Sequence, residues 1–372
     1  MLEHILKDDP VYRQLKDEVE DYCGPVLVSG CTDTAKWHLT SLIGNHKKKQ
    51  FKIIIVPDEN KARQWVEASH FFGEKVQYIP AKDPLFYTAD VHGNAIARDR
   101  MLAIKKIVDD KCGTFVMTID AVMDQVVPLS DIKNHMMTFK MGETLEEATI
   151  AEEFVARGYE KAPFVEAPGE FAVRGGIIDI FPYTQESPYR IELWGDEIDS
   201  IRSFDAQSQR SLENLDDVTI YPAAEQPMEK NGVSFLDYFK ETETLFFLDE
   251  LNHLEENAKA VQEEFQQSCE NRKEKGEISL SGDWMCTWEE LCHKINDRNC
   301  VAMSLLDPKK SNWKISGQFN ITVKSMSSYQ SSFELLVKDL KQYKKEGYQI
   351  VLLSGSRTRA ERLAKDLQEE GL

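Results

Sequence analysis

The residues best placed to do chemistry lie directly after the first apolar run of the chain. Gly30–Trp37 (GCTDTAKW) has the register of the phosphate-binding loop GxxxxGK(S/T), in which backbone amides and a lysine hold phosphates and a hydroxyl holds Mg²⁺. Ala35 stands in place of the second glycine, and Trp37 stands in place of the hydroxyl. Because only Gly30 and Lys36 remain, we predict a degenerate loop without nucleotide hydrolysis and a solvated Lys36. Residual nucleotide binding stays open.

A pair of acidic residues follows a later apolar run. Asp249 and Glu250 end the segment Phe246–Glu250 (FFLDE), which resembles the strand and acid that position Mg²⁺ and water in such NTPases. Without a working phosphate loop, this degenerate acidic motif has no metal-bound nucleotide to act on. We therefore expect Asp249 to cap the helix that follows, because a carboxylate is favourable at the positive N-terminal end of a helix.

Other polar groups do not form a catalytic set. His92, Arg98 and Arg100 lie in DVHGNAIARDR and could be functional, but the helix expected at Ala95–Val108 needs a solvated face in any case. No Ser-His-Asp set, Cys-His set or carboxylate pair stands out. The seven cysteines include no CxxC pair, which predicts reduced thiols rather than disulfides or a metal site. We expect no catalytic residue and no metal ligand set.

The stretch Glu166–Ser211 alternates polar and apolar residues at the period of a β-strand. Arg190, Glu192 and Trp194 share one face, and the isoleucine and leucine between them share the other. Arg174 alternates with apolar residues in the same way. An exposed tryptophan flanked by arginines has the composition of an interface hot spot. We predict that Arg174, Arg190 and Trp194 lie together, exposed, on a docking surface. The alternative is that Trp194 caps the sheet and is half covered by a loop.

The elements that must position these residues follow from the spacing of apolar runs. Near-continuous apolar runs alternate with helical patterns before residue 130 and after residue 222, which predicts a parallel sheet covered on both faces. The residues between them show antiparallel patterns. We therefore predict one α/β domain in two pieces, 1–130 and 223–372, with an inserted α+β domain, 131–222. The expected strands of the parallel sheet are Pro25–Ser29, Phe51–Val56, Val76–Ile79, Thr114–Thr118, Leu245–Leu248, Cys300–Leu305 and Gln349–Leu353.

The connecting segments are predicted from polarity. We expect an acidic helix at Asn252–Gln267 and a second, mixed-charge helix at Phe333–Glu346. Gln226–Gly232 and Gln267–Gly282 are candidate linkers.

The composition excludes several classes of protein. The chain has 372 residues and 41% hydrophobic residues, which suits a folded protein of two or three domains. A formal net charge of −19 argues against a broad nucleic-acid surface, because phosphate contacts need clustered Lys and Arg. The N-terminus has no signal-peptide core, and no apolar run is long enough to span a membrane. We expect a soluble, cytoplasmic protein without membrane contacts.

Several segments resemble a known family. GEFAVRGGIIDIFP, YRIELWGDEIDSIRSFD and SQRS resemble the N-terminal module of the bacterial transcription-repair coupling factor family, which is itself similar to the excision-repair protein UvrB. KDPLFYTADVHGNAIARDRM and SRTRAERLAKDL also fit. The resemblance implies a UvrB-like, RecA-type parallel-sheet domain with an inserted domain that binds UvrA. It assigns the UvrA contacts to Arg174, Arg190 and Trp194.

The resemblance also implies a function for the whole protein. The family recruits nucleotide excision repair to RNA polymerase stalled at DNA damage. Its polymerase-binding domain and its ATP-driven, Mg²⁺-dependent motor on double-stranded DNA would follow Leu372. The present chain is then expected to be a non-catalytic adaptor without a cofactor of its own.

Two departures separate the chain from UvrB itself. The phosphate loop is degenerate, and the segment Asp83–Arg100 is too short for the aromatic hairpin with which UvrB clamps DNA. The competing hypothesis is a DNA-dependent ATPase and damage-recognition protein of the UvrB type. A third hypothesis, compatible with the adaptor, is that the rest of a longer protein masks the docking surface at rest, because an exposed apolar face invites association.

Overall fold

The computed structural model divides the chain into two compact units, Met1–Ile321 and Thr322–Leu372. The structure describes residues 6, 9–21, 24–44, 50–82, 91–110, 112–225, 232–239, 244–275, 285–308, 313–324, 326, 329 and 332–372. Most of the predicted linker Gln226–Gly232 lies outside these residues, and so do residues 83–90 of the segment judged too short for a hairpin.

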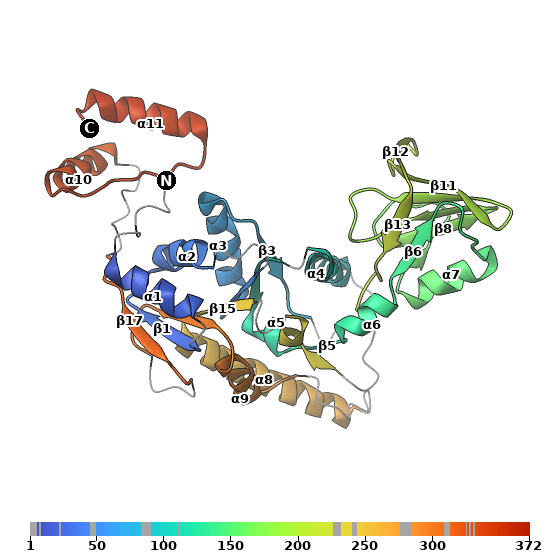
Figure 1. Ribbon diagram of the computed structural model, residues 1–372, viewed down its shortest axis with the longest axis horizontal. Helices are drawn as coiled ribbons and strands as arrows, with labels where there is room; N and C mark the ends of the chain where they lie inside the picture. Colours follow the sequence, from blue (N-terminus) through green and yellow to red (C-terminus); the bar gives the residue numbers. More distant parts are fainter. Residues whose placement is uncertain are drawn as a thin grey trace. The chain divides into compact units, whose positions relative to one another are not determined.

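A seven-stranded parallel sheet forms the centre of the first unit (Figure 1), in the order β17-β1-β16-β15-β2-β4-β3. Strands from before and after the inserted domain pair directly, as in the register of Phe246 with Ile53. The predicted α/β fold in two sequence pieces is therefore confirmed. The strands are β1 Pro25–Ser29, β2 Phe51–Val56, β3 Val76–Ile79, β4 Gly113–Thr118, β15 Thr244–Asp249, β16 Cys300–Ser304 and β17 Gly317–Asn320.

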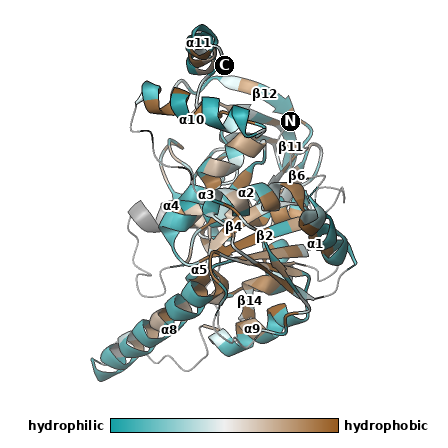
Figure 2. Cartoon of the chain, turned by 90° about the vertical axis from the view of Figure 1, so that its left-hand side faces the viewer, coloured by the Kyte–Doolittle hydropathy of each residue, from teal (hydrophilic) through white to brown (hydrophobic). Residues whose placement is uncertain are grey.

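Helices cover both faces of this sheet, with hydrophobic strands between them (Figure 2). Alternate residues of β2 enter two different cores, because successive side chains of a strand point to opposite faces. Ile53 and Ile55 belong to one cluster, and Ile54 and Val56 belong to the other. The elements of this domain outside the parallel sheet are α1 Pro10–Glu20, α2 Asp33–Leu42, α3 Glu59–Ser69, η2 His70–Phe72, α4 Val91–Asp109, α5 Ile119–Met123, β5 Gln125–Val126, α6 Leu129–Asn134, β14 Val233–Ser234, η3 Phe235–Tyr238, α8 Leu251–Glu274 and α9 Trp288–Asn296.

The inserted domain is built on a separate six-stranded sheet, in the order β12-β11-β10-β9-β8-β7. Its apolar face packs on α7, where the rings of Phe154 and Phe171 lie 5.2 Å apart between centres. An antiparallel ribbon of β6 and β13 brings the two ends of the domain together. The elements are β6 Met137–Lys140, α7 Glu147–Ala156, β7 Glu160–Lys161, β8 Glu170–Arg174, β9 Ile177–Ile180, β10 Tyr189–Trp194, β11 Glu197–Phe204, β12 Ser211–Leu215 and β13 Asp217–Ile220.

The chain that returns from the inserted domain is fastened to α4. The Tyr221 hydroxyl donates to Asp109 Oδ1 at 2.6 Å. Arg100 Nε donates to Glu225 Oε1, also at 2.6 Å. Asp109 and Arg100 both lie on α4, so one helix of the α/β domain holds the returning segment at two points.

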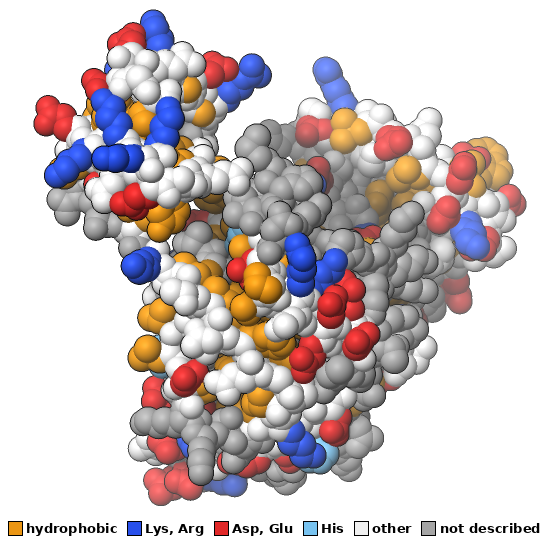
Figure 3. Space-filling model, turned by 60° about the vertical axis from the view of Figure 1, so that its left-hand side comes forward, with side chains coloured by type: hydrophobic (Ala, Val, Ile, Leu, Met, Phe, Trp, Pro, Cys, Tyr) orange, Lys and Arg blue, Asp and Glu red, His pale blue; other side chains and the backbone are white. Residues whose placement is uncertain are grey.

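The second unit contains two helices, α10 Phe333–Lys345 and α11 Arg357–Glu369. Figure 3 shows charged side chains spread over its surface, with hydrophobic side chains among them. The prediction of a strand at Gln349–Leu353 is wrong, because no described residue of this unit is in a strand that could pair with it. The apolar side chains of Ile350, Leu352 and Leu353 are consequently exposed. The range 223–372 thus divides at Ile321 instead of forming one piece of the sheet domain.

The acidic helix after β15 is longer than predicted. We expected it to end at Gln267, with a linker from there to Gly282, but α8 continues to Glu274. Residues 267–274 are polar, which is typical of a linker. Many of them also have good helix propensity, so they extend a solvated helix instead.

Candidate functional site

The loop with the phosphate-binding register is closed by another segment of the same chain. Gly30 has φ +79°, and a Cβ at this position would lie 2.0 Å from the carbonyl oxygen of Ile321, just beyond β17. Ile321 N donates to Ser29 O at 2.9 Å, and Cys31 N donates to Ser304 O at 3.1 Å. Glycine at position 30 therefore admits a protein backbone, in the place where a phosphate loop would admit a nucleotide.

Lys36 is buried, so the prediction of a solvated side chain is wrong. Only 1% of the side chain is exposed, and its Nζ lies 2.5 Å from Asp249 Oδ1 and 2.6 Å from Glu250 Oε1. Burial disfavours the charged amine, but the two carboxylates outweigh burial and raise the pKa of Lys36. The last positive group of the degenerate loop is thus neutralised by the degenerate acidic motif.

Asp249 is not a helix cap, which corrects the second prediction about this region. Its Oδ1 faces Lys36, and its Oδ2 accepts a hydrogen bond of 2.8 Å from Trp65 Nε1. The capping position of α8 is Glu250, at φ 60°. Asp249 is the last residue of a buried strand, so its carboxylate stays in the interior where the lysine and the indole satisfy it.

The substituted positions of the loop also serve packing. Helix α2 begins at Asp33, so Ala35 and Trp37 lie on its first turns. The ring of Trp37 packs edge-on against Trp65 at 6.4 Å between centres. Asp33 occupies the first turn of α2 and pairs with Lys61 at 2.8 Å. The positive end of the helix, which binds phosphate in working loops, therefore faces a carboxylate of the same chain.

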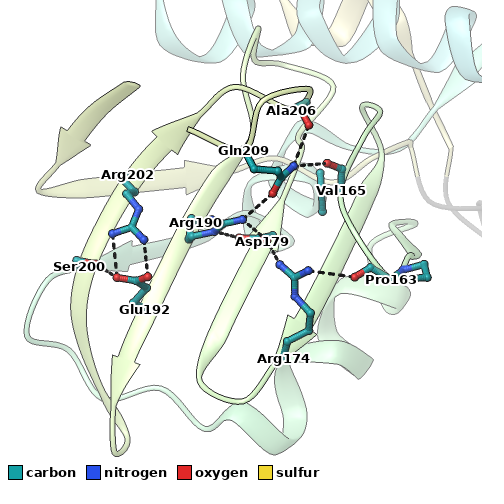
Figure 4. Close-up of polar contacts among 10 residues, drawn as sticks. All are labelled: Pro163, Val165, Arg174, Asp179, Arg190, Glu192, Ser200, Arg202, Ala206 and Gln209. Atoms are coloured by element: carbon teal, nitrogen blue, oxygen red, sulfur yellow. Dashed lines mark hydrogen bonds and ion pairs between the residues drawn. The ribbon is translucent and has the colours of Figure 1, made fainter. Parts of the chain in front are cut away.

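Two of the predicted docking residues, Arg174 and Arg190, lie on one face of the inserted sheet, and Figure 4 shows how they are paired. Arg190 contacts Asp179 through two hydrogen bonds, Nε to Oδ1 at 2.6 Å and Nη2 to Oδ2 at 2.8 Å. Arg174 Nη2 donates to the same Oδ2 at 2.5 Å. These three side chains, called the arginine row below, cross β8, β9 and β10.

The exposure of the row differs from the prediction. Trp194 is 83% exposed, which confirms its open position and excludes the alternative of a tryptophan half covered by a loop. The Arg174 and Arg190 side chains are only 34% and 15% exposed, and Asp179 is completely buried. The prediction that all three residues are exposed therefore holds for Trp194, holds in part for Arg174 and is wrong for Arg190.

A small apolar cluster explains why Arg190 is covered. Val165, Ala172, Phe181 and Phe204 bury one end of the polar face. The Arg190 guanidinium lies over the ring of Phe204, 4.4 Å from its centre. Phe204 is the last residue of the neighbouring strand β11, and Gln209, in the loop that follows it, accepts a hydrogen bond of 2.9 Å from Arg190 Nη2. An argument based on alternation within one strand could not show these contacts.

Asp179 is the residue that sequence reasoning undervalued. It stands directly opposite Arg190 in the antiparallel register and opposite Ala172 on the other side. Opposite charges at directly paired positions are a recognisable signal once the register is known. The hydrogen bonds to Asp179 raise the pKa of Arg190 and keep its charge fixed.

The charges of the ion-paired arginines and carboxylates in Figure 4 do not cancel. Next to the row, Glu192 pairs with Arg202 and accepts a hydrogen bond from Ser200. Partial burial opposes the ionisation of Glu192, but the bonds from Arg202 and Ser200 outweigh it and lower its pKa. Three arginines and two carboxylates leave one net positive charge, and Arg174 is the row's more exposed cation. A partner carboxylate would complete this set.

Of His92, Arg98 and Arg100, which the sequence singled out on α4, Arg100 serves the fold. The side chain of His92 lies outside the described part of the chain, and Arg98 is exposed. Arg100 is buried and bonded to Glu225 and to the carbonyl oxygen of Pro80, at 2.6 and 2.7 Å. The expectation of a solvated helix face is therefore wrong for Arg100.

Two further searches cover the described residues only. None of their His, Cys, Asp and Glu side chains form a group of three or more that could hold a metal ion. None of their helices is both long enough and apolar enough to cross a membrane.

Comparison with known proteins identifies the class of the inserted domain. Residues 137–225 match the family model of the UvrB interaction domain. This range contains β6 to β13 and ends at Glu225, which α4 holds. The domain inserted into the parallel α/β domain is therefore similar to the UvrB interaction domain.

Proteins similar to this chain include transcription-repair-coupling factors of several bacteria. The protein of Bacillus subtilis (strain 168) is 23% identical over 99% of this chain and 36% of its own length. That of Escherichia coli (strain K12) is 30% identical over 49% of this chain and 16% of its length. That of Staphylococcus aureus (strain USA300) is 27% identical over 63% and 20%. The chain thus spans between 16% and 36% of these relatives. The similarities support an N-terminal module of a transcription-repair coupling factor, as the sequence motifs predicted.

Proposed function

We propose that this chain is a non-catalytic adaptor whose inserted domain binds UvrA. In this proposal it recruits nucleotide excision repair to RNA polymerase stalled at DNA damage. In this proposal, polymerase binding, DNA binding and ATP-driven translocation would be carried by further parts of a longer protein. No metal and no cofactor takes part in the adaptor function.

One observation carries the proposal. The range that matches the UvrB interaction domain contains a sheet face with an open tryptophan and an unbalanced positive charge. Large aromatic side chains and arginines dominate the energetics of protein interfaces. Trp194 would enter an apolar pocket of UvrA, while the outer edge of Arg174 would meet a carboxylate. Arg190, which is largely covered, would act mainly by holding Asp179 and thereby Arg174.

The test is a titration of purified UvrA with the chain and its variants. We expect Trp194→Ala and Arg174→Ala each to weaken binding by about 2–4 kcal/mol. The control is Arg63→Ala, which removes an exposed arginine from α3 in the α/β domain and should leave the affinity unchanged. Unchanged affinity in both docking variants, with intact circular dichroism spectra, would overturn the assignment.

The alternative is a DNA-dependent ATPase of the UvrB type. It is favoured by Lys36, Asp249 and Glu250, which meet in space as the corresponding groups of an NTPase would. It is opposed by their direct contacts, because the lysine already has two carboxylate partners at 2.5 and 2.6 Å. We expect no ATP turnover by this chain, with or without DNA. Turnover that disappears in a folded Lys36→Ala variant would replace the adaptor proposal by the enzyme.

A further inference from the structure

Phe164 lies beside the arginine row and exposes its ring to solvent. Its surface is 58% exposed. The guanidinium carbon of Arg174 lies 4.6 Å from the centre of this ring. Arg174 is also bonded to Asp179 and, at 3.3 Å, to the carbonyl oxygen of Pro163. The ring and the cation therefore form one unit at the open side of the row.

The segment that carries Phe164 is tied to the sheet on both sides. Before it, Ala162 N donates to Phe171 O at 2.8 Å. After it, Val165 is completely buried. The next two amides donate to the Glu170 carboxylate at 2.8 and 2.9 Å. A large ring held in one place loses little conformational freedom on binding, so its exposure is favourable for docking.

Phe164 and Trp194 flank the same face of the sheet. Arg174, under Phe164, stands opposite Ile177, which stands opposite Glu192 on β10. Trp194 lies two residues further along β10, on the same side as Glu192. Arg174 on β8, which carries the ring of Phe164 against its guanidinium, and Trp194 on β10 are two strands apart in the sheet, about 10 Å across it. This separation fits inside one protein interface of ordinary size.

We propose that Phe164 is a second aromatic docking residue for UvrA, in addition to Trp194. The complementary surface would be an apolar pocket for the ring, with a carboxylate at its rim that pairs with the outer edge of Arg174. This inference rests on the proposed function, and it adds a contact that lies on a loop outside the strands of the arginine row. The arginine row contains two arginines and one carboxylate, and this excess of positive charge is the reason to propose an acidic rim on UvrA.

The experiment is a titration of purified UvrA with the whole chain and three single variants. We expect Phe164→Ala to weaken binding about ten-fold or more. Phe71→Ala is the matched control, because Phe71 is also a phenylalanine and is 50% exposed, but lies in the α/β domain. If Trp194→Ala weakens binding and Phe164→Ala does not, the inference is wrong and the proposed function stands. If the unmodified chain does not bind UvrA, the proposed function is wrong, and the inference that rests on it is wrong as well.

A double-mutant cycle separates direct contact from support of Arg174. We expect Phe164→Ala to weaken binding further in the Arg174→Ala background, because the ring enters its own pocket. No further loss in that background would mean that Phe164 only holds Arg174, and would overturn the docking role. Phe164→Trp should retain more affinity than Phe164→Ala if a ring is what UvrA binds.

Discussion

Pairing within the chain decides which charged residues are available to a partner. Lys36 and Arg190 look alike in the sequence, since each is a cation in a recognisable motif. In the structure each is held by a buried carboxylate, Asp249 for the lysine and Asp179 for the arginine. Arg174 shares Asp179 and remains partly open. Arg174 is therefore the arginine that can still bind a partner, because it shares one carboxylate with Arg190 and is the more exposed of the two.

The contact between Lys36 and Asp249 is expected to stabilise the fold. Lys36→Met leaves two carboxylates near each other without a cation, and removing one member of a buried pair costs about 3–5 kcal/mol. We expect a loss of this size in urea unfolding. Lys259→Met is the control, because Lys259 lies at the same 2.5 Å from Glu255 but is 54% exposed, so this substitution should change the free energy of unfolding far less than Lys36→Met. Equal effects of the two substitutions would contradict the buried pairing.

Helix α4 connects the inserted domain to the parallel sheet. Its Arg100 binds Glu225 at the end of the inserted domain and lies 3.7 Å from Asp124, which follows α5. Lys82, just after β3, contacts Glu225 at 2.5 Å. Four segments that are distant in sequence therefore meet in one buried ionic cluster. Such a cluster holds the base of the inserted domain, and its stability depends on the protonation of its carboxylates.

The stability of this cluster should depend on pH. Burial raises the pKa of Asp124 to about 7, although Arg100 opposes the shift. The unfolded chain releases this proton near pH 4. Between these values the folded state binds more protons, so the free energy of unfolding falls as pH rises towards 7. Thermal unfolding at pH 5 to 8 should show this fall in the unmodified chain and a weaker one in Asp124→Asn.

The matched control for this pH dependence is Asp199→Asn, which replaces an exposed carboxylate of the inserted domain. It should keep the pH dependence of the unmodified chain. An Asp124→Asn profile parallel to that of the unmodified chain would show that Asp124 is ionised throughout this range.

The chain combines two domains of different character. In the parallel-sheet domain the residues of the degenerate phosphate loop contact other parts of the chain, and in the inserted domain one sheet face carries exposed aromatic side chains. The parallel-sheet domain has Gly30 and Lys36 at the positions of a phosphate-binding loop, but Ile321 closes on Gly30, and Asp249 and Glu250 pair with Lys36. The inserted sheet leaves Trp194 and Phe164 in solvent. This division supports an adaptor in which one domain serves as a scaffold. Masking of the open face by further parts of a longer protein stays a prediction.

Local pattern was enough for the architecture. Side-chain alternation in β8 to β10 and the apolar runs of β1, β2, β15 and β16 depend on neighbouring residues, so the insertion of one domain into another was readable from the sequence. The same pattern was insufficient at Gln349–Leu353, because a strand also needs a neighbour to bond with.

The sequence by itself determined the parallel sheet, the inserted domain and the place of the docking motif. Only the tertiary structure decided which of the singled-out side chains are open. Lys36 and Asp249 are 213 positions apart, and their contact follows from the way β1, α2 and β15 pack. Burial of Arg190 depends on Phe204 of the neighbouring strand and on Gln209 in the loop after it. Exposure and ion pairing are properties of segments that meet in space, and local sequence does not contain them.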